Sequence, residues 1–233
     1  MNKEELKQFL SSYGFEIDEA KMNNIEHFID ETLITNEKFN LTAITDKDVF
    51  REKMVLDSAL GIVDLDLNNK KIIDVGTGAG YPGMVIYLLN PNVKITLLDS
   101  TSKKINYLEN YAKGRGYHID FAISRIEEYA RLNVEKYDYV FARAVAALNI
   151  LLELVMPLLK VNGYFVALKG LGAEEEIKLS KNAFKKLDCE VMEVKHYVLP
   201  ESKEERNVIL IKKKSSTNKK YPRTYAEIKK SPL

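Results

Sequence analysis

The sequence predicts an α/β fold in which a mostly parallel, seven-stranded sheet carries helices on both faces. From Lys71 onward, short runs of β-branched and apolar residues alternate with helical patterns, and this alternation is typical of a parallel sheet. A turn with glycines at alternate positions, Gly76, Gly78 and Gly80, follows the first predicted strand. The last two apolar runs have only a polar loop at Glu201–Glu205 between them. This arrangement predicts an antiparallel hairpin at the C-terminal end of the sheet.

Seven strands and five helices make up this predicted core. The strands are expected at 71–75, 93–98, 118–122, 137–142, 163–168, 190–198 and 206–213. The helices are expected at 81–89, 102–113, 125–131, 148–159 and 173–187. Pro82 is tolerated in the first of these helices, because the N–H that proline lacks has no partner in a first helical turn.

A helical extension precedes the sheet. Helical periodicity runs over 3–12, 18–38 and 46–60, and Asp18 fits the N-cap of the second helix. This extension either covers the sheet or forms a lid or substrate platform, and both possibilities stay open from the sequence. We therefore expect three parts: an N-terminal helical extension at 1–66, a core domain at 67–214 and a basic C-terminal tail at 215–233.

The composition is that of an ordinary globular protein with room for one α/β domain and an extension. The chain has 233 residues, of which 45% are hydrophobic and 30% charged. A single cysteine, Cys189, permits no internal disulfide and fits a reducing cytoplasm. The N-terminus shows no apolar signal segment, and the most apolar stretch, Ala144–Leu159, is too interrupted to span a bilayer. We expect a cytoplasmic protein without a membrane segment.

The net charge of +1 is unevenly distributed. Between residues 212 and 230 the chain carries eight basic residues against one acid, Glu227: Lys212, Lys213, Lys214, Lys219, Lys220, Arg223, Lys229 and Lys230. A basic tail on a slightly acidic body often contacts a polyanion, and a tail that only improves solubility is an equal alternative.

The glycine turn indicates a nucleotide site, because a strand, a glycine turn and a helix N-terminus form a crevice for such ligands. The dinucleotide fingerprint is not matched, since Tyr81 stands where its third glycine belongs. The pattern Asp-x-Gly-x-Gly-x-Gly from Asp74 to Gly80 instead resembles the first motif of Rossmann-like S-adenosylmethionine-dependent methyltransferases. Asp99, at the end of the next strand, can accept hydrogen bonds from both ribose hydroxyls.

Further candidate residues follow the other parallel strands, whose carboxyl ends meet at the same edge of the sheet. Ser124–Glu127 follows the third strand, and Ile126 can pack on a purine face. Arg143 follows the fourth strand, where the methyl group of the donor would be presented. A cation there requires an anion, either the carboxylate of the donor, a substrate phosphate or a structural partner such as Glu153 or Asp138.

The sequence offers no activated nucleophile or metal cluster. No Ser-His-Asp set or Walker loop is visible, the three histidines are not grouped, and Cys189 has no basic neighbour to activate it. Since the sequence shows no group that would activate a nucleophile, a substrate atom that needs no general base fits best. The N7 lone pair of guanine is such an atom, exposed at the base edge.

The chain resembles the bacterial small-subunit ribosomal RNA methyltransferase G family (RsmG, also called GidB). The glycine motif alone is common to many methyltransferases, but Gly-Tyr-Pro-Gly together with Ala-Arg-Ala is much more specific. The matching segments are Asn40–Thr42, Leu56–Ser58, Asp74–Gly83, Leu97–Ser100, Lys103–Lys104, Ser124–Glu127, Arg143–Ala146, Leu168–Gly170, Tyr221–Arg223 and Pro232–Leu233. Met54 is a departure, because the family often has histidine at that place.

The resemblance implies methyl transfer from S-adenosyl-L-methionine to N7 of one guanine in a loop of 16S ribosomal RNA, either naked or in a small-subunit assembly intermediate. The implied donor-binding residues are Gly76, Gly78, Gly80, Tyr81, Asp99, Ile126, Glu127 and Arg143. RNA phosphates would be held by Lys103, Arg125, Lys169, Arg206 and Arg223, with Arg143 and Lys169 as positioning candidates.

Other functions remain open from the sequence. The nearest is a methyltransferase acting on a small molecule or a protein. An NAD-dependent oxidoreductase is disfavoured by Tyr81, and a nucleotide-sensing regulator without chemistry is a third alternative. No coiled-coil pattern indicates an obligate dimer, so we expect a monomer.

Overall fold

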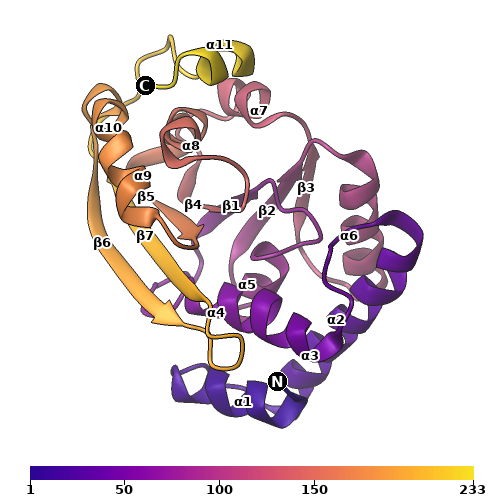
Figure 1. Cartoon of the computed structure of the whole chain (residues 1–233). Coiled ribbons are helices and arrows are strands. Elements are labelled where there is room, and N and C mark those ends of the chain that lie inside the picture. The colour runs from indigo at the N-terminus through magenta and orange to yellow at the C-terminus, as the bar shows by residue number, and fades with distance from the viewer.

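The computed structural model describes residues 1–233 and contains one seven-stranded sheet in the order β3-β2-β1-β4-β5-β7-β6 (Figure 1). The first five strands run parallel, and β7 lies antiparallel between β5 and β6. The strands are β1 (Lys71–Val75), β2 (Lys94–Asp99), β3 (Asp120–Ile123), β4 (Tyr137–Arg143), β5 (Leu159–Lys169), β6 (Cys189–Val198) and β7 (Glu205–Lys213). The predicted fold class, including the C-terminal hairpin, is confirmed.

Helices cover both faces of this sheet (Figure 1). Those before and beside β1 and β2 are α1 (Lys3–Ser12), α2 (Glu19–Phe39), α3 (Lys47–Phe50), the π-helix η1 (Arg51–Leu56), α4 (Asp57–Leu60), α5 (Gly83–Leu89) and α6 (Ser102–Gly114). The later ones are α7 (Ile126–Leu132), α8 (Leu148–Val155), the 3₁₀ turn η2 (Met156–Leu158), α9 (Ala173–Leu179), α10 (Lys181–Leu187) and α11 (Tyr225–Lys230).

Several predicted boundaries are wrong, each for a local reason. The helix expected from residue 81 begins at Gly83, whose N–H donates to Asp74 rather than to a helical carbonyl. The helix expected to reach residue 159 ends at Val155, because Pro157 cannot donate a helical hydrogen bond. The helix expected at 173–187 is broken at Ser180, whose hydroxyl donates to the carbonyl of Glu176.

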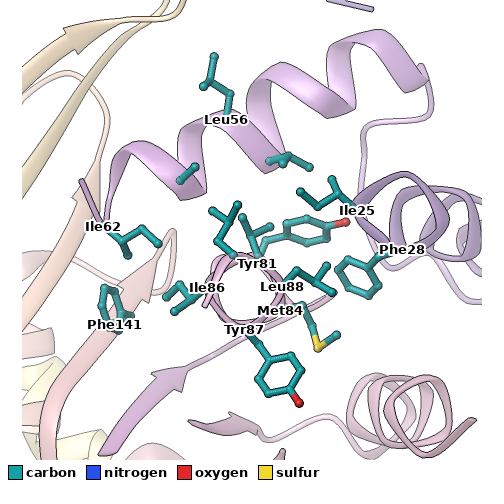
Figure 2. Packing of buried hydrophobic residues seen from close by; sticks show 14 of the residues in the cluster. Ile25, Phe28, Leu56, Ile62, Tyr81, Met84, Ile86, Tyr87, Leu88 and Phe141 are labelled. Carbon is teal, nitrogen blue, oxygen red and sulfur yellow. The ribbon is translucent and has the colours of Figure 1, made fainter. Parts of the chain in front are cut away.

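The N-terminal helices pack on the face of the sheet that α5 covers. Phe28 of α2 stacks on Tyr81 with ring centroids 5.2 Å apart, and Phe50 meets the same ring edge-on. Figure 2 shows Ile25, Phe28 and Tyr81 in one apolar layer with Met84. Asp18 caps α2 by accepting a hydrogen bond from the backbone N–H of Lys21, as predicted. The extension is therefore a built-in cover for this face.

The helical segment expected at 46–60 is continuous but contains the π-helix η1. A π-turn shifts the phase of the helix, so buried polar side chains can reach inward from it. Glu52 and Asp57 are both buried here. This irregular segment brings Asp57 to the carboxyl ends of the strands.

The C-terminal segment (residues 215–233) packs on the core next to α7 (Figure 1). Tyr221, Ile228 and Leu233 are buried in the apolar cluster on the α7–α8 face. The guanidinium of Arg223 binds the fully buried Glu153, with Nη2 2.6 Å from Oε2 and Nε 2.8 Å from Oε1. None of the helices combines the length and apolar composition that crossing a membrane requires.

Candidate active site

The glycine turn after β1 has the backbone that its sequence predicts. Gly76, Gly78 and Gly80 have φ values of +68°, +59° and +98°, in the region that side chains disfavour. A Cβ on Gly76 would lie 2.7 Å from the side chain of Val145. Glycine therefore allows the positive φ angles of this turn. At Gly76 it also allows close packing against the loop after β4.

Asp74, at the end of β1, holds the glycine turn in place by accepting hydrogen bonds. Its Oδ2 accepts hydrogen bonds from the Thr77 hydroxyl at 2.6 Å and the Gly83 N–H at 2.8 Å, while Oδ1 is buried without a partner. Complete burial raises the pKa of Asp74 to about 6. Asp74 thus orients the glycine turn and the start of α5.

Two adjoining cavities lie at the carboxyl ends of the parallel strands, one of about 300 Å³ and one of about 830 Å³. We call them the smaller and the larger cavity. Both are lined by Gly76, by Lys104 of α6 and by the Ala144–Ala146 loop after β4. Ala144 has φ +54°, an uncommon conformation for alanine that turns this loop across the glycine turn.

The smaller cavity contains a carboxylate that two backbone N–H groups hold in place. Asp99 lines it, and its carboxylate accepts hydrogen bonds from the Gly78 N–H at 3.0 Å and the Thr101 N–H at 2.8 Å. Each carboxylate oxygen still has accepting capacity for a ribose hydroxyl. Ile126 and Glu127, at the start of α7, also line this cavity. Residues at or directly after the carboxyl ends of β1, β2 and β3 therefore meet here.

Arg143 lines the larger cavity, and its structural anion is Asp57. Arg143 Nη1 donates to Asp57 Oδ2 at 3.1 Å and to the Lys53 carbonyl at 3.1 Å, and Nη2 lies 3.2 Å from the sulfur of Met54. The structural partners considered from the sequence are wrong. Glu153 binds Arg223, and Asp138 binds Lys160.

Asp57 also connects Arg143 to the C-terminal hairpin. The hydroxyl of Tyr197 in β6 donates to Asp57 Oδ1 at 2.8 Å, and Arg206 Nε lies 3.5 Å from the same oxygen. Burial, with the neighbouring Asp57 carboxylate, raises the pKa of Tyr197 well above its usual range. Arg206 also pairs with Glu204, which binds Lys53 in turn. The wall of the larger cavity is thus a connected network of paired charges.

Lys169 is held in the same cavity by its own acidic partner. Its Nζ donates to Glu176 Oε2 and to the Ala146 carbonyl, both at 2.8 Å. Glu176 Oε2 also accepts a hydrogen bond from the Leu148 N–H at 2.6 Å. Lys169 therefore braces the Ala144–Ala146 loop against α9.

The structure separates the five basic residues that were predicted to hold RNA. Lys169 and Arg206 line the larger cavity, Arg125 lines the smaller one, and Lys103 lies outside both, over the Phe39 ring. Arg223 is engaged by buried Glu153, so its guanidinium anchors the C-terminal segment. Arg223 was predicted to hold an RNA phosphate, and in the structure its guanidinium is paired with Glu153 instead.

Four further residues of this region were not singled out as candidates from the sequence. Asp57 and Tyr197 lie far from Arg143 in the chain, and Glu176 sits on a helix with two other glutamates. Lys104 follows Lys103 and lines both cavities. Asp57 and Lys104 lie in the matching segments Leu56–Ser58 and Lys103–Lys104, and no such signal marked Tyr197 or Glu176.

The fold is shared with solved structures of other proteins. A "predicted O-methyltransferase" from Agrobacterium tumefaciens superposes with a TM-score of 0.55 at 15% identity, covering 69% of this chain and 82% of that one. The cyclase SpnF superposes with a TM-score of 0.54 at 13% identity, covering 68% and 80%. The sheet order, the glycine turn and Asp99 together define a Rossmann-like methyltransferase fold.

Comparison with relatives over the whole chain shows which methyltransferase family this is. A family model described as rRNA small subunit methyltransferase G matches residues 21–209. Proteins named ribosomal RNA small subunit methyltransferase G are 40% identical in Halalkalibacterium halodurans, over 98% of both chains, and 39% identical in Bacillus cytotoxicus, over 100% of this chain and 99% of that one. The chain belongs to the ribosomal RNA small subunit methyltransferase G family, which sets aside the oxidoreductase and regulator alternatives.

Proposed function

We propose that this enzyme transfers the methyl group of S-adenosylmethionine to N7 of a guanine in an unpaired loop of 16S ribosomal RNA. One observation carries this proposal beyond the class of the enzyme. The larger cavity contains no free general base: its two carboxylates, Asp57 and Glu176, are both ion-paired, and neither histidine nor cysteine lines it. Guanine N7 carries a lone pair and no proton, so it needs no general base before it attacks the methyl group.

The donor would lie across both cavities. Asp99 and the Gly78 turn would hold the ribose, Ile126 and Glu127 would meet the adenine, and the methionine part would follow the turn into the larger cavity. S-adenosylmethionine supplies a methyl group on a cationic sulfur. Gly76 and Ala144 line both cavities, and we place that sulfur beside them.

Arg143 is compatible with a cationic methyl donor nearby because it forms an ion pair with Asp57. An unpaired guanidinium would repel a sulfonium group, and in a partly buried site such repulsion is screened weakly. Asp57 Oδ2 lies 3.1 Å from Arg143 Nη1 and balances the charge of this guanidinium. Arg143 can then position the substrate through its fixed side chain. Most of the rate enhancement then comes from alignment of the guanine and exclusion of water.

Contact with RNA phosphates would come from lysines that the structure leaves without acidic partners. Lys103 and Lys104, in the first turn of α6, have no carboxylate within ion-pair distance. Lys104 lines both cavities, and Lys103, at the preceding position of α6, is exposed. Lys103, which the sequence already indicated, and Lys104 are therefore our leading candidates for positioning the RNA strand, whereas Arg223 is engaged by Glu153. A ribosomal substrate also implies a cytoplasmic enzyme, which we expect to act as a monomer.

The test is transfer of a labelled methyl group from S-adenosylmethionine to isolated acceptors. Naked 16S ribosomal RNA and small subunits from a strain that lacks the gene would be compared with total protein and small-molecule extracts. We expect label in the RNA at N7 of guanine and none in the other fractions. Label in protein or small molecules alone would overturn the proposed substrate while leaving the methyltransferase class intact.

A further inference from the structure

The smaller cavity has one wall that belongs neither to the sheet nor to its glycine turn. Tyr225, the first residue of α11, lines this cavity together with Asp99 and Ile126. The ring of Tyr225 lies against the guanidinium of Arg125, with Cζ 4.7 Å from the ring centroid. A planar cation stacked on a tyrosine ring forms a flat surface of the kind that binds nucleobases.

Tyr225 is fixed in this place by the docking of the C-terminal segment. Buried Glu153 binds the guanidinium of Arg223 and also accepts a hydrogen bond from its backbone N–H at 3.0 Å. The guanidinium of Arg131 in α7 donates to the Pro222 carbonyl at 3.1 Å. Both anchors lie directly before α11, so the start of this helix has a defined position beside α7 (Figure 1).

Residues after Tyr225 also anchor the C-terminal segment to the core. Ile228 and Leu233 are buried in the same apolar cluster as the residues of α8. Thr224 and Glu227 form a capping box, in which each side chain accepts a hydrogen bond from the backbone of the other. The segment predicted as a basic C-terminal tail is therefore a docked element, and it places Tyr225 at the cavity.

We propose that Tyr225 binds the adenine of the methyl donor, and that the C-terminal segment is a structural part of the donor site. Arg125 then acts as a positioning residue that holds the tyrosine ring, in place of the RNA contact predicted from the sequence. This inference rests on the proposed assignment of the smaller cavity to adenosine. It is independent of the identity of the methyl acceptor.

Calorimetry with S-adenosylhomocysteine tests the proposal without any acceptor. Tyr225→Ala should weaken binding about tenfold, in line with the loss of one base–aromatic stack, and Tyr225→Phe should bind within about twofold of the wild type. 5′-Methylthioadenosine, which contains the adenosine part without the amino-acid part, should lose affinity by the same factor. Unchanged affinity in a folded Tyr225→Ala variant would overturn the proposal.

A second variant serves where Tyr225→Ala fails to fold. The chain contains no tryptophan, so Tyr225→Trp places a single fluorophore at the cavity. S-adenosylhomocysteine should quench its emission in a saturable way, whereas Tyr13→Trp, exposed at the end of α1, should not respond. If the Tyr225→Trp variant binds the ligand by calorimetry and its emission stays unchanged, the proposed role of Tyr225 is contradicted. If the wild type itself binds no ligand, the proposed donor site fails instead.

Discussion

Arg143 Nη1 lies 3.1 Å from Oδ2 of Asp57, and this ion pair joins the end of β4 to the irregular helix before β1. The two residues are 86 positions apart in the chain. Asp57 is almost fully buried and Arg143 nearly so. A pair of this kind keeps a cation beside the donor site without leaving its charge unbalanced.

Removal of the acid from this pair should be costly. Asp57→Ala leaves Arg143 without its anion in a buried place, and we expect the free energy of unfolding to fall by about 3–5 kcal/mol. Arg143→Met and the double variant complete a cycle that urea denaturation can measure. Strongly non-additive losses are expected, whereas additive losses would show that the two side chains do not stabilise one another.

Gly83 should tolerate no side chain, although its φ is ordinary. A Cβ there would lie 2.3 Å from the side chain of Leu97 and 2.8 Å from Asp74 Oδ2. We expect Gly83→Ala to lower the free energy of unfolding by about 1–3 kcal/mol through overpacking. Gly114→Ala is the matched control, because nothing lies within 4 Å of its added Cβ. Equal thermal stability of the two variants would contradict this packing.

Asp74 should make stability depend on pH in a direction opposite to that of most acids. Its pKa is raised from 3.8 to about 6 by burial, so the unfolded chain releases this proton first as the pH rises. The free energy of unfolding should therefore fall between pH 4 and pH 7, by about 3 kcal/mol at most from this residue. Asp74→Asn removes the titration.

The measurement is the difference in free energy of unfolding between Asp74→Asn and the wild type, from urea denaturation at several pH values. We expect this difference to shift in favour of the variant as the pH rises from 4 to 7. A flat difference would mean that Asp74 ionises normally despite its burial.

Asp99 should decide whether adenosine is held in the smaller cavity. Asp99→Asn loses charge-assisted hydrogen bonds to the ribose, so S-adenosylhomocysteine should bind about tenfold more weakly or worse. Asp120→Asn, on the exposed start of the neighbouring strand β3, is the control and should bind normally. Retained affinity in both variants would remove Asp99 from the donor site.

RNA binding should depend on salt through the first turn of α6. Lys103→Ala and Lys104→Ala should each weaken RNA binding and lower the slope of log affinity against log salt by about 0.7. Lys113→Ala, exposed at the far end of the same helix, should leave the slope unchanged. A salt series in which all three variants match the wild type would exclude this helix from the RNA interface.

Periodicity and turn chemistry were sufficient to predict the fold, because most segments agree locally with their final structure. The apolar runs at 71–75 and 206–213 became β1 and β7, and Asp18 caps α2. The errors fall where a few atoms decide a boundary. Examples are the serine that interrupts 173–187 and the proline that ends α8.

The candidate site was predicted in part for the same reason. Residues that follow parallel strands must converge on one edge of the sheet, and Gly76, Asp99 and Ile126 do line a common cavity. The partners of Arg143 and the position of Tyr225 arise from tertiary contacts between distant segments, which leave no periodic signal. Whether these residues bind donor and RNA remains a prediction.

The most direct test is a map of N7-methylguanine in 16S ribosomal RNA from a strain that lacks this gene. We expect one N7-methylguanine in an unpaired loop to disappear, to return with the wild-type gene and to stay absent with Asp99→Ala. If every N7-methylguanine of the 16S ribosomal RNA persists in the deletion strain, the enzyme does not perform the reaction proposed here.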